Sequence, residues 1–135
     1  MVWRVLRSVR VKFMSREATA IALFNSGSSV TIIQRRFFEK VFGSTWSILE
    51  KPLRVCLVDG RCIDIDRYAQ LVIEINGFSF PETVPVVDEF VEEIEIKEKK
   101  IRLPELIIGA GTMDKYGIAL DPKEGIKIAG ATLLI

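Results

Sequence analysis

The segment from Ala22 to Ser29 is the part of the sequence best suited to chemistry. An apolar run ends abruptly in Asn25, Ser26, Gly27 and Ser28. A strand that stops in small polar residues and a glycine presents its first polar side chain at a fixed point, because the strand holds the backbone before it. Such turns also occur without any function. The pattern nevertheless makes Asn25 the candidate reactive position.

The side chains that the sequence lacks narrow the possible chemistry. The chain of 135 residues contains no histidine, which excludes Ser–His and Cys–His nucleophile pairs, histidine general bases and most catalytic zinc sites. Its two cysteines are too few for a disulfide scaffold or a four-cysteine zinc site. We therefore expect neither a metal nor another cofactor, and any catalysis must come from carboxylates, lysine, tyrosine, cysteine or hydroxyl groups.

Charge and hydropathy predict a soluble chain that binds neither nucleic acid nor a charged membrane surface. Lys and Arg number 19 and Asp and Glu 18, so the net charge of +1 recruits neither nucleic acid nor an anionic membrane. The longest uncharged run, 18–34, includes a polar stretch and cannot span a membrane, and arginines interrupt the place where a signal peptide needs an apolar core. We expect a cytoplasmic protein, with any membrane tether outside this chain. Few Asn and Gln beside many Lys, Glu and Ile are typical of a thermophile.

The elements that must position Asn25 are mostly strands, because the dominant hydrophobic period is two. Apolar residues alternate with basic ones over 9–13, which predicts a half-buried strand, and the continuous apolar run over 18–24 predicts a more buried one. Further strands are expected at 30–33, 53–57, 62–65, 68–75, from 78 onward, at 106–108, and in short pieces after 117 joined by 121–125.

Turn and helix signals complete the predicted architecture. Asp59-Gly60 and Asn76-Gly77 are the strongest hairpin signals in the chain. Arg35–Phe42, closed by Gly43, predicts a short helix, and a helical turn is expected over 113–116. The fold class is therefore all-β with one or two short helices.

An acidic stretch interrupts the pattern of strands. Residues 88–98 include six acidic residues and one lysine, which predicts a solvated excursion rather than a core element. No internal repeat or low-complexity tract is visible. We expect a single domain over 1–135, with an acidic insertion at about 88–100.

Three segments together resemble one protein family. With Asp in place of Asn25, the candidate loop would read Asp-Ser-Gly-Ser-Ser after apolar residues, which resembles the active-site motif of retropepsin-like aspartic proteases. Asp59-Gly60 lies about 35 residues further on, where this family has a flap hairpin. The segment from Leu106 to Met113, an apolar run and a glycine leading into a helical turn, resembles the family's second signature. The resemblance covers most of the chain, roughly 9–128.

This resemblance implies a homodimeric acid-protease barrel whose flap, at about 53–66, closes over an extended polypeptide substrate. Catalysis then needs two carboxylates that share one proton around a water molecule. Because the chain has one such motif, position 25 of each subunit would meet at a two-fold axis. The resemblance also implies that Ser26 hydrogen-bonds across the dimer and supports the two loops, and that the Gly27 backbone binds the substrate. The other implied residues are Ser28 beside the dyad, Val58, Asp59, Gly60 and Arg61 in the flap, and 1–5 and 131–135 in an interdigitated dimer sheet.

Asn25 is the departure from the family that changes the chemistry, because an amide cannot act as a general base near neutral pH. Either the natural chain has Asp and this copy carries a substitution, or the natural protein is a non-catalytic relative. The rest of the catalytic scaffold looks complete, which favours a substitution. The sequence thus predicts an aspartic endopeptidase protomer that is inactive with Asn25. The alternative is a naturally non-catalytic dimeric peptide-binding or scaffold protein on the same fold.

The two cysteines flank the predicted flap turn. With a two-residue turn at Asp59-Gly60, Leu57 would face Cys62 and Cys56 would face Ile63. The cysteines would then point to opposite faces, so we expect two buried or half-buried thiols and no disulfide. A redox-controlled flap is the alternative.

Basic residues dominate the N-terminal segment. The first sixteen residues contain five basic residues and no acid, which could form a nucleic-acid-binding arm. No aromatic stacking pattern accompanies them, so we favour a solvated strand face. A small β-barrel nucleic-acid binder is the remaining class of function, and we expect no nucleic-acid partner.

Overall fold

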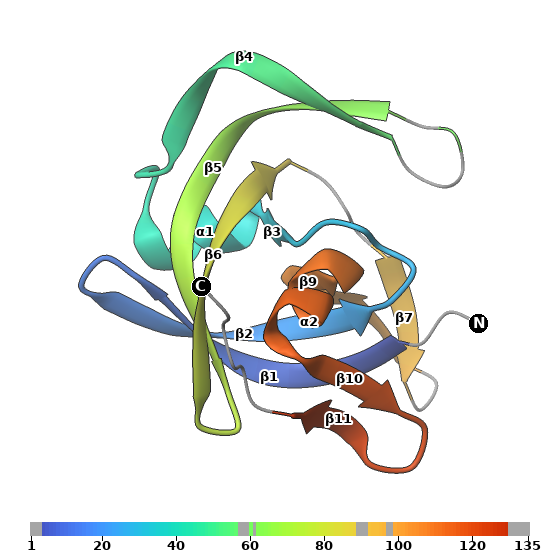
Figure 1. The fold of residues 1–135 in the computed structure, drawn as a ribbon. Coiled ribbons are helices and arrows are strands. Elements are labelled where there is room, and N and C mark those ends of the chain that lie inside the picture. Colours follow the sequence, from blue (N-terminus) through green and yellow to red (C-terminus); the bar gives the residue numbers. More distant parts are fainter. Residues whose placement is uncertain (1–3, 57–59, 61, 89–91, 97–98, 130–135) are drawn as a thin grey trace.

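Strands make up most of the structure, as the two-residue period predicts (Figure 1). The computed structural model describes residues 4–56, 60, 62–88, 92–96 and 99–129, with 92–96 and 99–103 described as strands only. The elements in chain order are β1 (Arg4–Phe13), β2 (Arg16–Asn25), β3 (Ile32–Gln34), α1 (Arg35–Phe42), β4 (Ser47–Cys56), β5 (Cys62–Ile75), β6 (Phe78–Val87), β7 (Glu92–Ile96), β8 (Lys99–Leu103), β9 (Leu106–Gly109), α2 (Ala110–Tyr116), β10 (Ile118–Asp121) and β11 (Gly125–Ile128).

Six strands close into a barrel. Hydrogen-bonded neighbours follow the order β1-β2-β9-β3-β6-β5-β4, and a further antiparallel pairing between β1 and β5 closes the ring and leaves β4 outside it. β9 runs parallel to β2 and antiparallel to β3, so it lies between two strands that are close in sequence. The pairs β7–β8 and β10–β11 form separate two-stranded sheets.

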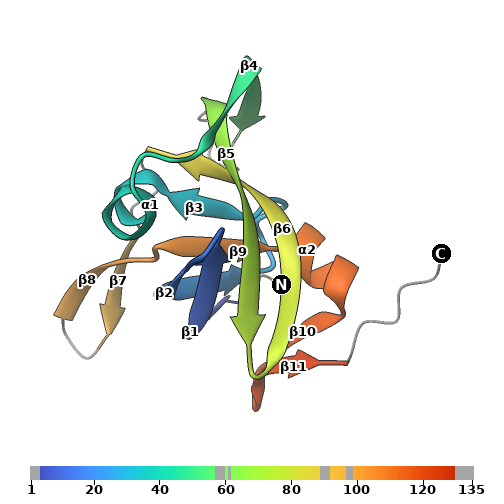
Figure 2. The same cartoon turned by 90° about the vertical axis from the view of Figure 1, so that its left-hand side faces the viewer.

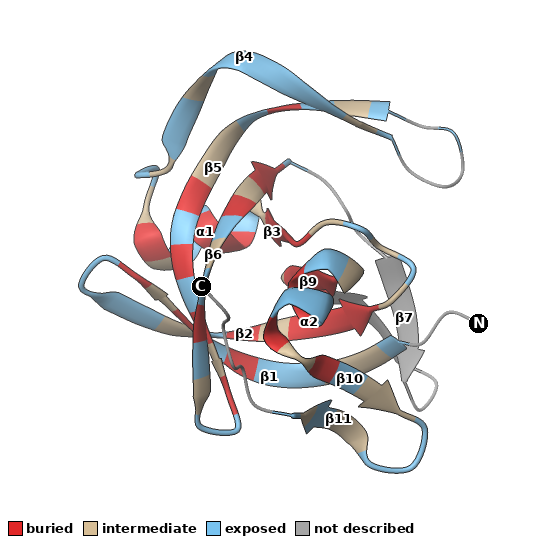
Figure 3. Cartoon of the chain, viewed as in Figure 1, coloured by how far each residue is buried: buried red, intermediate tan, exposed pale blue. Residues whose placement is uncertain are grey.

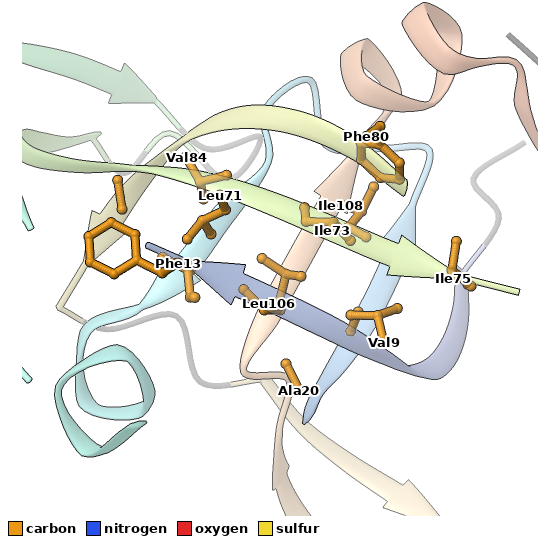
Figure 4. Close-up of a cluster of buried hydrophobic side chains, with 14 of the residues drawn as sticks. Val9, Phe13, Ala20, Leu71, Ile73, Ile75, Phe80, Val84, Leu106 and Ile108 are labelled. Atoms are coloured by element: carbon orange, nitrogen blue, oxygen red, sulfur yellow. The ribbon is translucent and has the colours of Figure 1, made fainter. Parts of the chain in front are cut away.

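Apolar side chains fill the barrel (Figure 4). On β1, Val9, Val11 and Phe13 are buried while Arg10 between them is exposed, which confirms the predicted alternation. The run that was predicted to be a more buried strand forms β2, whose last four residues are all buried. Figure 3 shows the contrast with β4, which carries no buried residue.

Helix α1 closes one end of the core with aromatic side chains. Its bounds agree with the sequence prediction, and Gly43 ends it with a φ of 76°, a conformation that glycine adopts without a steric penalty. Phe38 lies with its ring centroid 5.1 Å from those of both Phe13 and Phe42. Burial of these rings stabilises this part of the core.

Strand β5 differs in length from the expectation. Two strands were predicted over 62–65 and 68–75, but a single strand of 14 residues spans both. Its outer half pairs with β4 and its inner half with β6 and β1, so one continuous strand serves the barrel and the projecting hairpin. The predicted turn at Asn76-Gly77 is confirmed, with φ values of 51° and 78° at the two residues.

The acidic stretch contains more structure than was predicted. β7 and β8 pair as a hairpin, which projects from the barrel in Figure 2. The register places Glu93 opposite Arg102 and Glu95 opposite Lys100, and opposite charges favour such antiparallel pairs. The segment was predicted as an excursion outside the core, and the hairpin is a separate two-stranded sheet outside the barrel; its regular pairing with the basic segment that follows was not predicted.

Helix α2 begins at Ala110, three residues before the predicted helical turn. Tyr116 anchors its end, because the Tyr116 hydroxyl donates a hydrogen bond of 2.6 Å to the carbonyl of Pro81 on β6. In the part of the chain that the structure describes, neither helix has the length and apolar character needed to cross a membrane.

Candidate active site

Asn25 is the last residue of β2 and lies at the centre of the candidate site. The strand register pairs it with Gly109 of β9 on one side and with Arg4 of β1 on the other. Asn25 is 8% exposed, which places a polar side chain at the edge of the barrel core. Strands pair with the Asn25 backbone on both sides. The sheet, rather than a loop, therefore fixes the point from which the Asn25 side chain projects.

Hydrogen bonds within the following turn orient the Asn25 side chain. The Gly27 N–H donates to Asn25 Oδ1 at 2.9 Å, and the Ser28 N–H donates to the Asn25 carbonyl at 3.1 Å. The first bond forms an Asx turn and the second closes a β-turn. A carboxylate at position 25 could accept the same bond from Gly27, because its oxygen would occupy the same place.

The chain from 25 to 31, which we call the Asn25 loop, is held against β9 and α2. The Ala110 N–H donates to the Ser28 carbonyl at 2.6 Å, at the start of α2. A Cβ built on Gly109 would lie 2.4 Å from the Val30 carbonyl oxygen, and one on Gly111 would lie 2.9 Å from that of Ser29. The glycines of the second predicted signature are therefore required because backbone approaches backbone.

Two buried threonines add a brace that the sequence analysis did not identify. Thr31 Oγ1 lies 2.6 Å from Thr112 Oγ1, and the Gly109 N–H donates to Thr31 Oγ1 at 3.0 Å. Both threonines are about 5% exposed. Buried hydroxyls need partners, and here each satisfies the other. Their pairing depends on residues that are 81 positions apart, and no local pattern signals it.

A second apolar cluster lies beside the Asn25 loop, separate from the barrel core. We call it the cleft cluster. Partly buried residues from the N-terminal strand, the Asn25 loop and the two outer strands pack against it. Its buried members are Leu23, Ile32, Ile65, Val87 and Ile107, and the residues packed against them are Leu6, Val30, Val55 and Ile63.

The β4–β5 arm, formed by β4 and residues 62–67 of β5, projects beyond the barrel (Figure 1). Val55 and Ile63 face each other in the ladder and pack against the cleft cluster, while Ile65 belongs to it. A cleft of about 450 Å³ opens beside the arm and is lined by residues 63–67 of β5, by Val86 and Val87 of β6, and by Asp88 just after β6. Apolar side chains and charged ones, three carboxylates and the Arg67 guanidinium, therefore both line this cleft.

The register at the end of the arm corrects the prediction for the cysteines. Cys56 lies directly opposite Cys62, with 4.0 Å between their Cα atoms, and the two form a disulfide. The expectation of free thiols on opposite faces was wrong because it assumed a two-residue turn. The observed register leaves residues 57–61 between the two cysteines, which shifts the pairing by one residue and puts both side chains on one face.

Charged residues fix the base of the arm. Asp88 Oδ1 accepts hydrogen bonds from Arg67 at 3.0 Å and from Arg35 of α1 at 2.6 Å. The Arg67 guanidinium also lies 5.1 Å from the ring centroid of Trp46, just before β4. These contacts connect the arm to the helix and to β6 at the point where it leaves the barrel.

The other predicted site residues lie around the Asn25 loop and at the end of the arm. Ser26 and Ser28 are half-buried and Gly27 is exposed. Gly60 is exposed, with a φ of 91° and open space around it. Val58, Asp59 and Arg61, with residues 1–3 and 131–135 of the predicted dimer sheet, lie outside the described residues, and so the flap and dimer assignments stay predictions.

The groups with shifted pKa values lie away from the Asn25 loop. Hydrogen bonds from the backbone N–H groups of Lys123 and Glu124 lower the pKa of Asp121, and the Arg10 guanidinium lowers that of Glu17. A hydrogen bond to Glu82 raises the pKa of Lys115. In the described ranges no three His, Cys, Asp or Glu side chains gather so that they could hold a metal ion. The chemistry of the site therefore depends on the residue at position 25.

Comparison with known proteins identifies the fold. A solved structure, the retroviral protease-like domain of Ddi1 from Leishmania major, is similar over 93% of this chain and 90% of that chain, with a TM-score of 0.58 and 16% sequence identity. The chain has a retropepsin-like fold. Neither models of protein families nor curated proteins match the sequence. At this identity the likeness concerns the fold. It confirms the all-β class with one or two short helices that the sequence pattern predicted, and the retropepsin-like barrel that the family resemblance implied.

Proposed function

We propose that this chain is the protomer of a homodimeric aspartic endopeptidase whose active form has Asp at position 25. One observation carries the proposal: the side-chain oxygen of residue 25 is fixed by the Gly27 N–H, at the end of a strand that β9 and α2 brace from behind. A retropepsin-like barrel with a braced polar residue at this position supports acid–base chemistry there. The fold neighbour, described as retroviral protease-like, supports the same class of activity.

A dimer is part of the proposal because the chemistry needs two carboxylates. The 135 residues contain one Asn-Ser-Gly-Ser-Ser segment, so one chain supplies one member of the dyad. A two-fold axis beside Asn25 would bring the second member from the partner, since a two-fold interface joins the same patch on both subunits. Ser26, half-buried beside Asn25, would brace the two loops across that axis.

In the Asn25→Asp form the two carboxylates would share one proton, because two like charges in contact cannot both ionise. The ionised carboxylate takes a proton from water while the water oxygen attacks the peptide carbonyl carbon. The protonated carboxyl gives its proton to the carbonyl oxygen, and the tetrahedral diol then collapses as the C–N bond breaks and the amine is protonated. An amide at position 25 can do neither step, so the chain with Asn25 does not cleave peptides.

The cleft cluster and the β4–β5 arm would bind the substrate. The cleft cluster combines apolar side chains of the barrel strands, of the Asn25 loop and of the arm, which suits apolar side chains of an extended peptide. In this proposal the arm serves as the flap, and Gly27, which is exposed, offers its carbonyl to the peptide backbone. No cofactor takes part.

A second candidate function is favoured by Asn25 itself. A protein that keeps the groove and the arm but has an amide at the catalytic position would bind peptides without cutting them. Asn25 is compatible with the fold, because its Oδ1 makes the same hydrogen bond that a carboxylate would make. We therefore retain a non-catalytic dimeric peptide-binding protein as the alternative.

The test compares Asn25 protein with the Asn25→Asp variant on a mixed peptide library between about pH 3 and 7, read by mass spectrometry. We expect cleavage by the Asn25→Asp variant at least about 100-fold above that by the Asn25 protein, in line with the contribution of general acid–base catalysis. Inhibition by a pepstatin-like transition-state mimic should accompany it. Sedimentation of both proteins should show a dimer.

Asn76→Asp is the matched control, because it makes the same chemical change in the exposed β5–β6 turn, outside the Asn25 loop. It should leave cleavage at the level of the Asn25 protein. A folded, dimeric Asn25→Asp variant that is inert over the whole pH range would exclude the protease proposal. Peptide binding by the Asn25 protein would then favour the second candidate.

A further inference from the structure

The Cys56–Cys62 disulfide is the last cross-link of the β4–β5 ladder. Cys56 ends β4 and Cys62 begins β5, and the pairs next along the ladder are Val55 with Ile63 and Arg54 with Asp64. The bond therefore joins the two strands of the arm at its outer end, immediately before residues 57–61. It is the one covalent tie across the described part of the arm.

The two faces of the arm carry different residues at this point. Neighbouring positions along a strand point to opposite faces, so the cysteines face away from the Val55–Ile63 pair. Val55 and Ile63 pack against the cleft cluster, whereas Cys56 and Cys62 are both exposed. The disulfide thus lies on the solvent side of the arm, directly behind two side chains that line the proposed substrate cleft.

Besides the disulfide and the ladder, the outer half of the arm is held by the packing of Val55 and Ile63 and by an exposed ion pair between Arg54 and Asp64. No residue of β4 is buried, and Ile65 is the one buried residue among the described residues 62–67 of β5. Elements with few buried contacts open locally at low free energy, and so their opening responds strongly to a cross-link. Exposed disulfides are also those that external thiols reach and reduce.

We propose that Cys56–Cys62 is a thiol–disulfide exchange site for a dithiol reductant, and that its redox state sets how tightly the arm is held over the cleft cluster. A thiolate of the reductant attacks one exposed sulfur and forms a mixed disulfide, and the other cysteine leaves as a thiolate. The second thiol of the reductant then displaces the protein sulfur. The protein gains two electrons and two protons, and the dithiol is oxidised to a disulfide.

The consequence for cleavage rests on the proposed function, because it treats the arm as the flap of a protease. The exchange site itself does not. Reduction removes the tie behind Val55 and Ile63, so these side chains separate more often from the cleft cluster. We expect weaker binding of an extended peptide and a higher KM in the reduced state.

Hydrogen exchange of the Asn25 protein tests the site without any need for activity. The protein is compared before and after treatment with dithiothreitol, with free thiols counted by alkylation and mass spectrometry. We expect both thiols to become accessible in the folded protein, and amides of residues 53–56 and 62–65 to exchange about tenfold faster after reduction. Amides of β2 and β9 should be unchanged.

The double variant Cys56→Ser/Cys62→Ser is the matched control. It should exchange at the rate of the reduced protein and should not respond to dithiothreitol. Resistance of the native disulfide to dithiothreitol would overturn the proposal, and so would equal exchange in the oxidised and reduced arm.

Cleavage by the Asn25→Asp variant separates the two proposals. A KM that rises about threefold or more on reduction, but not in the variant that also lacks both cysteines, supports the redox control of cleavage. If the Asn25→Asp variant is inert in both redox states while the arm still loosens on reduction, the protease proposal fails and the exchange site stands. If the variant cleaves with the same KM in both states, the redox control is overturned.

Discussion

The Asn25 loop and the β4–β5 arm face each other across the cleft cluster but are stabilised in different ways. Backbone hydrogen bonds, close glycine contacts and a buried threonine pair hold the loop against β9 and α2. The arm has exposed side chains along β4, one disulfide at its end and an ion-pair network at its base. The Asn25 loop is therefore packed into the core, whereas the β4–β5 arm projects from the core and is anchored mainly at its base.

This difference fits what the two regions would do in a protease. A reacting group must be held in one geometry, which requires support from rigid elements. A cover over a bound peptide must open, and moving elements come from the less stable parts of a fold. The contrast can be measured by making the same substitution on both sides of the cleft.

Truncation of a leucine should give the largest difference. Leu23 on β2 is 2% exposed within the cleft cluster, whereas Leu53 on β4 is 55% exposed. Leu23→Ala should lower the free energy of unfolding by about 3 kcal/mol, because it removes buried contacts and leaves a cavity. Leu53→Ala should change it by less than about 0.5 kcal/mol. Urea unfolding of the two variants measures both values, and equal losses would show that the arm is packed as firmly as the loop.

Removal of the buried hydroxyl of Thr31 should have an intermediate effect. Thr31→Val leaves the Gly109 N–H and the Thr112 hydroxyl without their partner, which should cost about 2 kcal/mol. Thr83→Val is the matched control, since the hydroxyl of Thr83 donates to Gln70 on an exposed face and its loss should cost less than about 0.5 kcal/mol. In the Asn25→Asp background, Thr31→Val should also reduce kcat more than Thr83→Val does. Similar kcat values for the two variants would mean that the brace does not position residue 25.

The smallest effect concerns the ion pair that attaches α2 to β6. Lys115 Nζ lies 3.1 Å from Glu82 Oε2, and this contact raises the pKa of Lys115. A raised pKa in the folded state gives stability that is present below the unfolded pKa and is lost as the pH rises through the folded pKa. Lys115→Met should cost less than about 0.5 kcal/mol at pH 7, because Lys115 is half exposed, and the difference from the parent should shrink above about pH 10.5.

The control for this ion pair is Lys115→Met in a Glu82→Gln background. There the pH dependence of the difference should disappear, because the carboxylate that favours the charged amine is absent. A difference that persists unchanged would assign the effect to the packing of the lysine stem on Tyr116, whose ring centroid lies 5.2 Å from Lys115 Nζ.

Local patterns predicted much of the fold. Helix α1 and its terminal Gly43 follow from an amphipathic run and a glycine, and the β5–β6 hairpin follows from Asn76-Gly77, whose residues adopt the positive φ angles that this turn requires. Asn25 was singled out because a buried strand ends there, and the strand does end there. These features depend on neighbouring residues, which is why one sequence is enough to predict them.

Registers and distant pairings were not predictable in the same way. The disulfide was not predicted because a two-residue turn was assumed, whereas five residues separate Cys56 and Cys62. This difference shifts the pairing by one residue, and a shift of one residue moves each side chain to the other face. The β7–β8 hairpin was not predicted because the acidic segment alone has no strand signal. Its pairing depends on alignment with the basic segment that follows it.

The sequence by itself determined that this chain consists mainly of strands, that Asn25 stands at the end of a buried strand, and that an amide there cannot activate water. Those conclusions rest on hydrophobic period, turn residues and functional-group chemistry, all of which are local. Only the tertiary structure decided that Thr31 meets Thr112, that Gly109 admits no side chain, and that Cys56 lies opposite Cys62 on the outer face of the arm. The threonine and glycine contacts form because β9 lies between β2 and β3 in the sheet. The disulfide forms because of the register between β4 and β5.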